Sequence, residues 1–183
     1  MRPEEFLPPE EYAKVRDAEL DRIVEHKKRR RVDYGDRLSF LFEDERTVRH
    51  QIQEVIFMDS IVDRKVVEEL IATYEPMVPG DDEISLTAFY LVYNEGELEE
   101  FNAKMAGWES RLRLLLGDDE LGGRPIYDDY DPRRPKTVAY LKFKVPQALL
   151  ERPVSIKLDH PSLSVVVQTP FKARELVGGA PIH

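Results

Sequence analysis

Apolar residues recur at helical spacing near the start of the chain. Two prolines followed by two acidic residues, at 8–11, are typical of a helix start, because proline fits the first turn and carboxylates favour the positive end of the helix dipole. The basic run at 27–31 favours the opposite end of that dipole. The pattern predicts a first helix over 9–31. Its apolar side comprises Tyr12, Ala13, Val15, Leu20, Ile23 and Val24.

Two further helices are predicted after a short strand. Residues 38–42 form an apolar run bounded by turn residues, which is typical of a buried strand. Asp44 can cap a helix over 45–59, and Asp63 can cap another over 64–77.

The second half of the chain is rich in strand patterns. Residues 84–93 are apolar and β-prone, and 97–104 favour a short helix. Strict alternation of apolar and polar residues then predicts strands at 136–145, 154–159 and 162–169.

Connections in this half are short or polar. The turn at 159–162 would join the last two strands as a hairpin, and 111–116 with 123–127 would form another. Residues 128–135 predict a polar, proline-rich loop. We therefore expect an α+β fold in one domain, 1–183, with N-terminal helices (1–80) packed on a mainly antiparallel sheet (81–176).

Composition limits the chemistry available to this chain. Its 183 residues are 42% hydrophobic and carry a formal net charge of −9, which suits a globular protein. Cysteine is absent, so the chain forms no disulfide and has no thiolate zinc site, cysteine nucleophile or cysteine-held iron–sulfur cluster. We expect no cofactor.

Targeting signals are not evident. The first residues lack the basic-then-apolar order of a secretory signal, and no apolar run approaches the ~20 residues needed to span a bilayer. We expect a cytoplasmic protein without a membrane association.

Familiar catalytic motifs are missing as well. The sequence has no glycine-rich phosphate loop, dinucleotide fingerprint or nucleophile elbow, and no histidine pair at zinc spacing. His50 and Glu54 are four residues apart, but no third ligand lies nearby, so we predict no metal site and an exposed His50. Because these motifs are missing, we expect a non-catalytic protein.

The basic run at 27–31 is the strongest local charge feature. The other residues carry −9 − 5 = −14. The run can be an anion or RNA site, or simply a solvated helix end; the acidic remainder argues against nucleic acid. Arg30 points to the apolar side of the helix, where it must snorkel or pair with a carboxylate.

A polar column borders the apolar stripe of the second predicted helix. Helical spacing aligns Thr47, Gln51 and Glu54, and Glu43 precedes them. Half-buried polar groups must be hydrogen-bonded, so Glu43 or Glu54 can pair with an arginine of the basic run. The set is either a structural network between helices or a polar pocket for a small ligand. This candidate pocket comprises Arg30, Arg31, Glu43, Thr47, Gln51 and Glu54.

Two weaker features lie elsewhere. Asp159 and His160 occupy a predicted turn, where Asp159 can cap the turn or His160 can act as an acid, base or ligand. Trp108 is the single tryptophan and is expected to pack in the core.

Two blocks of the chain carry a family resemblance. The first holds residues 27–32, 35–36, 41–43, 47–48 and 51–54, and the second holds 139–143 and 159–161. Across roughly residues 5–170 the chain resembles the family known as domain of unknown function 3501. In that family the position of His50 is more often apolar or aromatic, which further weakens a metal site there.

The resemblance implies no established activity. Members of the family are often encoded beside rubrerythrin-like proteins and iron–sulfur oxidoreductases, which suggests these proteins as partners. The first hypothesis is therefore a non-catalytic accessory or interaction protein of an oxidative-stress or electron-transfer system. The alternative is a small-ligand or anion-binding protein, or an enzyme, that uses the arginine, glutamate and glutamine pocket.

Overall fold

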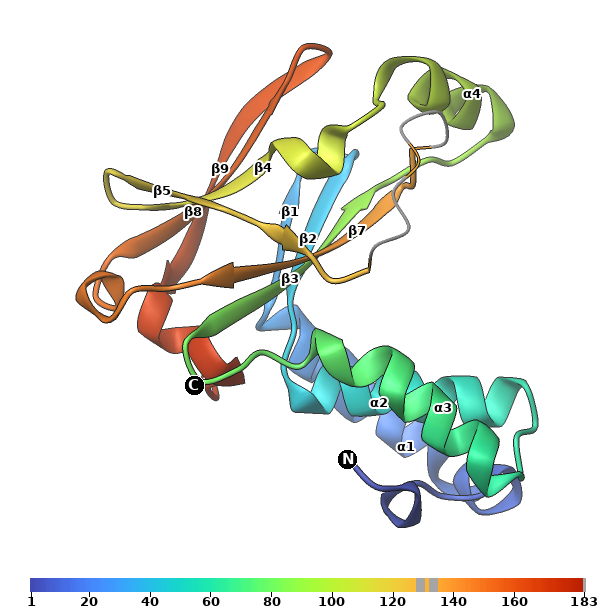
Figure 1. Ribbon diagram of the computed structural model, residues 1–183. Helices are drawn as coiled ribbons and strands as arrows, with labels where there is room; N and C mark the ends of the chain where they lie inside the picture. The colour runs from blue at the N-terminus through green and yellow to red at the C-terminus, as the bar shows by residue number, and fades with distance from the viewer. Residues whose placement is uncertain (128–130, 132–134, 183) are drawn as a thin grey trace.

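The helices of the N-terminal half form a lobe beside two antiparallel sheets (Figure 1). The computed structural model describes residues 1–127, 131 and 135–182. The lobe contains α1 (Pro9–Lys28), α2 (Glu45–Met58) and α3 (Arg64–Tyr74), whereas α4 (Glu95–Lys104) lies at the far end of the sheets. Short 3₁₀ turns occur at Pro3–Glu5, Glu75–Met77, Trp108–Arg111, Gln147–Leu149, Ala173–Glu175 and Val177–Gly179.

The strands divide between a five-stranded and a four-stranded sheet. The five-stranded sheet has the order β1-β2-β3-β7-β6, and the four-stranded sheet has the order β5-β4-β8-β9, with every pairing antiparallel. The fold is therefore α+β, as the sequence predicted. The strands are β1 (Arg31–Tyr34), β2 (Leu38–Phe42), β3 (Glu83–Tyr90), β4 (Leu112–Leu116), β5 (Asp119–Gly122), β6 (Arg124–Pro125), β7 (Val138–Lys144), β8 (Pro153–His160) and β9 (Leu163–Lys172).

The main hydrophobic core lies between the two sheets. Phe40 and Phe143 of the five-stranded sheet and Ile156 of the four-stranded sheet are fully buried in it. Burial of each such side chain contributes about 1.5–3 kcal/mol. Trp108 is buried in the same core, as predicted, and its indole Nε1 donates to the carbonyl of Lys136 at 2.7 Å.

A smaller core holds the helical lobe together. Val48 and Ile52 of α2 pack with Ile71 of α3 and Met77 just beyond it. The predicted caps are confirmed: the Asp44 carboxylate accepts from the backbone N–H of Thr47 at 2.8 Å, and Asp63 accepts from Lys65 at 2.7 Å. Within the described part of the chain, no helix is long and apolar enough to cross a membrane.

The first helix is shorter than predicted. It ends at Lys28, and the basic run turns at Arg29 so that Arg31 begins β1, a strand that the sequence pattern did not indicate. Pairing with β2 explains the difference: Arg31 lies opposite Leu41, and the Phe42 N–H donates to the Arg30 carbonyl at 3.0 Å. Long-range strand pairing here outweighs the local helical preference.

The predicted hairpin after 111–116 is only partly correct. Strand β4 pairs with β5, but Arg124 and Pro125 pair with β7 in the other sheet. The chain changes sheets at Gly123, where a Cβ would lie 2.8 Å from the Phe143 ring, so only glycine fits. The β8–β9 hairpin is as predicted. Of the expected loop over 128–135, residues 128–130 and 132–134 lie outside the described residues.

Candidate functional site

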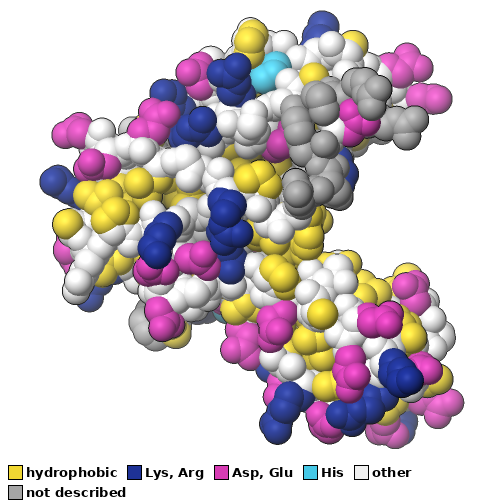
Figure 2. Space-filling view, viewed as in Figure 1, with side chains coloured by type: hydrophobic (Ala, Val, Ile, Leu, Met, Phe, Trp, Pro, Cys, Tyr) yellow, Lys and Arg dark blue, Asp and Glu magenta, His cyan; other side chains and the backbone are white. Residues whose placement is uncertain are grey.

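One face of the five-stranded sheet turns away from the main core. Directly opposed residues in a sheet share a face, so the strand register defines its rows. Figure 2 shows the surface hollowed between the helical lobe and the sheets, on the side away from the four-stranded sheet in Figure 1. The first row of this outer face is Arg31, Leu41, Thr87 and Tyr140, and the second is Asp33, Ser39, Phe89 and Val138.

Arg31 is fixed on this outer face by two neighbours. Its Nη1 donates to the Ser39 hydroxyl at 2.7 Å, and its guanidinium carbon lies 5.3 Å from the centre of the Phe89 ring. The side chain is half-buried. These contacts hold the planar guanidinium without neutralising its charge.

Lys27 lies in the last turn of α1, one turn before Arg31 in sequence. It is half-buried, and burial lowers the pKa of its ammonium group, with the neighbouring Arg31 acting in the same direction and Glu43 opposing. Among the residues that the structure describes, none provides Lys27 Nζ with a hydrogen-bond acceptor or a carboxylate within 4 Å. Its amine therefore retains its hydrogen-bonding capacity.

Glu43 is a buried carboxyl directly after β2. One oxygen accepts from the Thr87 hydroxyl at 2.5 Å, and the other accepts from the Thr47 hydroxyl. Burial raises the pKa of this carboxyl, while the two hydroxyls and Lys27 oppose the rise. Both oxygens thus have protein donors, and Glu43 acts on Lys27 through its electrostatic field.

Lys27 and Arg31 differ from the other shielded cations of the described chain. Every other lysine or arginine there that is at least partly buried has a carboxylate within 4 Å. The pairs are Arg16–Glu54, Arg30–Asp44, Arg37–Glu97, Arg49–Glu5, Arg113–Glu120, Lys142–Glu83 and Lys157–Glu120. A desolvated cation without a counter-ion is costly, so two neighbouring ones mark a candidate anion site.

Arg30, by contrast, belongs to a closed structural network. Its Nε donates to the Phe42 carbonyl at 2.8 Å, and its Nη1 donates to the Ala180 carbonyl at 2.9 Å. Arg30 pairs with a carboxylate, one of the two outcomes predicted for it, but the partner is Asp44, at 3.4 Å, and not Glu43 or Glu54. The Asp44 carboxylate also contacts His26 Nε2 at 2.6 Å. Arg30 is fully buried and has no surface from which to meet a ligand.

The remaining predicted pocket residues lie along α2. Glu54 accepts from the Tyr12 hydroxyl at 2.8 Å and pairs with Arg16 at 2.8 Å, which ties α1 to α2. Gln51 is exposed on the same column. The structure therefore links Glu43 to Thr47 and, through the main-chain carbonyl of Glu43 at 3.4 Å, to Arg30. Arg31 instead lies on the outer face of the sheet, against Ser39 and Phe89.

The sequence did not predict Lys27 and Thr87 as residues of the candidate site. The sequence identified Lys27 only as part of the basic run, because the direction of its side chain depends on where α1 ends. Thr87 gave no local signal, since it reaches Glu43 only through the pairing of β2 with β3.

The histidines do not extend the site. His50 is half-buried rather than exposed as predicted, and burial lowers the pKa of its imidazole. His160 is also buried: its Nε2 lies 3.0 Å from the Ala106 carbonyl, and its Nδ1 accepts from the Ser162 N–H at 3.2 Å, whereas Asp159 is exposed. The residues described here contain no group of three or more histidines and carboxylates that could hold a metal ion.

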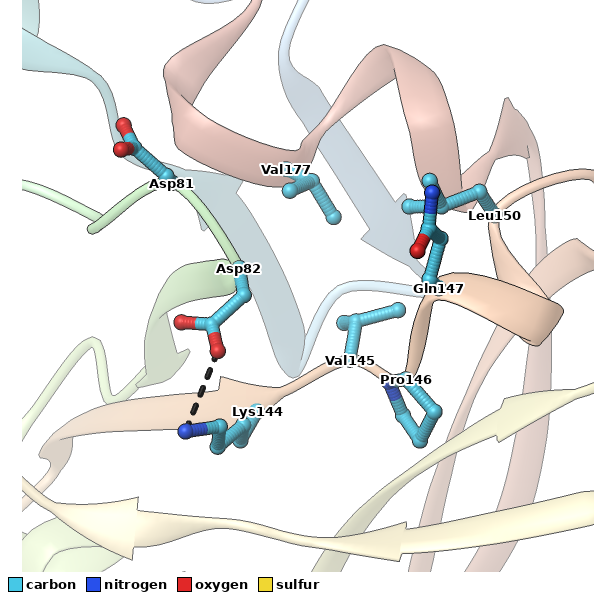
Figure 3. Close-up of a pocket in the computed structure, with 8 residues that line it drawn as sticks. All are labelled: Asp81, Asp82, Lys144, Val145, Pro146, Gln147, Leu150 and Val177. Carbon is cyan, nitrogen blue, oxygen red and sulfur yellow. Dashed lines mark ion pairs between the residues drawn. The ribbon is translucent and has the colours of Figure 1, made fainter.

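A separate cavity of about 670 Å³ opens where β3 begins and β7 ends (Figure 3). Val145, Leu150 and Val177 point into it, and Lys144 pairs with Asp82 at 3.1 Å on its edge. The lysine at this edge thus already has a carboxylate partner. None of the candidate site residues predicted from the sequence lines this cavity.

Comparisons with known proteins agree with the resemblance seen in the sequence. A crystal structure of a novel protein of unknown function from Burkholderia pseudomallei K96243 has a TM-score of 0.85, 30% identity and coverage of 97% of both chains. No curated protein matches the chain. The family model for "Protein of unknown function (DUF3501)" matches residues 1–177, and the chain therefore belongs to the DUF3501 family.

Proposed function

We propose that this protein binds a small anionic ligand between Lys27 and Arg31. The observation that carries the proposal is the missing counter-ion: these two half-buried cations lack a carboxylate within 4 Å among the described residues. The chain has 36 acidic residues against 27 basic ones, so carboxylates are plentiful, yet none of those in the described residues pairs with either cation. A ligand carboxylate or phosphate would complete the site.

The surroundings of the two cations support this function. Ser39 and Phe89 fix the Arg31 guanidinium, so little side-chain entropy is lost when a ligand binds. Glu43 lies close enough to favour the charged form of Lys27. Both Glu43 oxygens accept from threonine hydroxyls, and no acceptor among the described residues holds the Lys27 amine, which is therefore left for the ligand.

Isothermal titration with inorganic phosphate and with citrate tests the proposal. We expect saturable binding that weakens as salt rises, since exposed charge interactions are screened. Arg31→Met should weaken binding at least about tenfold, because a charge-assisted hydrogen bond contributes about 1.5–3 kcal/mol.

Arg29→Met is the matched control, because Arg29 is exposed and its replacement removes the same charge from the same run. It should leave the affinity within about twofold of the wild type, as expected for screened surface charge. Equal losses in the two variants would mean that the basic run attracts anions only nonspecifically, and no binding of either anion would refute the proposal.

A second candidate is the accessory role beside a rubrerythrin-like or iron–sulfur protein, which rests on the family resemblance. One surface favours a protein contact: an apolar groove at the tip of the helical lobe, where Val62 is 84% exposed and Leu7 is 44% exposed. Co-purification with the neighbouring gene products tests this role. A complex lost in Val62→Asp would support it, and no complex at micromolar concentrations would contradict it.

A further inference from the structure

We propose that Lys27 forms an imine with the carbonyl carbon of a 2-oxo acid whose carboxylate is held by Arg31. This inference rests on the proposed anion site and names its ligand class. It adds a covalent step that binding alone does not require.

The amine of Lys27 meets the structural conditions for a nucleophile. It is half-buried at the end of α1, and no acceptor among the described residues holds its Nζ. Lysines become nucleophilic when they are desolvated or placed beside another cation. Lys27 has both features, and the lowered pKa of its ammonium group is consistent with them.

Arg31 supplies the orientation that such a step needs. Its guanidinium is planar and fixed against Ser39 and Phe89, and a planar fork is suited to a carboxylate bound through two parallel hydrogen bonds. In a 2-oxo acid the carbonyl carbon is bonded directly to the carboxylate. A carboxylate on Arg31 would therefore bring that carbon to the neighbouring Lys27 amine.

The step balances without an oxidant or a reductant. The lone pair of the neutral Lys27 amine forms a C–N bond to the carbonyl carbon while the C=O π electrons move to oxygen. One nitrogen proton then passes to that oxygen, and the carbinolamine loses water as the C=N bond forms. Glu43 takes no direct part in this step, because its oxygens accept from the hydroxyls of Thr47 and Thr87.

Reductive trapping tests the inference. The full chain is incubated with pyruvate and cyanoborohydride, which reduces imines in preference to ketones, and the adduct is located by peptide mass spectrometry. We expect one carboxyethyl group per chain, on Lys27. Acetone, which lacks the carboxylate, should give at least about tenfold less adduct, because it loses the charge-assisted hydrogen bonds to Arg31.

Two variants test where the adduct forms. Lys27→Arg has no primary amine and should form no adduct, whereas Lys28→Arg changes an exposed neighbour that pairs with Glu25 and should react as the wild type does. Phosphate binding without a Lys27 adduct, or adducts spread over many lysines, would overturn the imine and leave the anion site intact. Loss of phosphate binding in the wild type would overturn both.

Discussion

Replacing Arg30 with methionine should destabilise the protein strongly, whereas the same change at Arg31 should not. The two arginines are adjacent, but their surroundings differ. Arg30 is fully buried, donates to the carbonyls of Phe42 and Ala180, and pairs with Asp44. Arg31 is half-buried and donates to one hydroxyl.

The magnitude follows from what Arg30→Met leaves behind. Three main-chain carbonyls, those of Phe42, Glu43 and Ala180, lose a charged donor. The buried Asp44 carboxylate keeps only His26 and its helix-capping contacts. Breaking a buried ion pair by removing one partner costs about 3–5 kcal/mol. Arg31→Met removes one partly exposed hydrogen bond and one guanidinium–ring contact, about 1 kcal/mol.

Urea unfolding followed by circular dichroism measures both values. With a slope of about 2 kcal/mol per molar urea, the Arg30→Met midpoint should fall by about 1.5–2.5 M and the Arg31→Met midpoint by about 0.5 M. A midpoint for Arg30→Met within about 0.5 M of the wild type would refute the structural assignment of Arg30. Equal shifts in the two variants would refute the distinction between the residues.

Two further predictions concern the same region. Gly179 has φ +68°, and a Cβ there would lie 2.9 Å from Asp44 Cβ, whereas Gly35 has φ +58° and nothing within 4 Å of a Cβ. In thermal unfolding, Gly179→Ala should therefore lower the free energy of unfolding by about 1–3 kcal/mol more than Gly35→Ala does. Equal losses would contradict the close packing of the C-terminal segment on Asp44. The folded-state pKa of Glu43 is raised by burial, so its favourable contribution is present at low pH and is lost as pH rises through that pKa. The unfolding free energy of the wild type relative to Glu43→Gln should therefore fall as pH rises above 4.5, the ordinary pKa of a glutamate, and a constant difference would show that Glu43 does not titrate with a raised pKa.

Helices with strong periodicity and a capping residue could be predicted from sequence. Helices α2 and α3 begin where Asp44 and Asp63 indicate, because the caps and the apolar stripes are local features. The alternating strands of the second half were predictable for the same reason. The family resemblance identified the family but predicted no reaction or ligand.

Features that depend on long-range pairing could not be predicted. Strand β1 is a polar segment that exists because β2 pairs with it, and Arg124 joins β7 because the chain changes sheets at Gly123. For the site, sequence identified the basic run but not which of its members face the sheet. The separation of Arg30 from Arg31 follows from the end of α1 at Lys28, which is set by that pairing.

A crystal structure of the protein soaked in iodide tests the central claim most directly, because anomalous scattering locates the anion without assumptions about the ligand. The anion site predicts an iodide within contact distance of both Lys27 Nζ and the Arg31 guanidinium in the wild type, and its loss in Arg31→Met. Iodide bound only at other basic residues, with none between Lys27 and Arg31, would contradict the site.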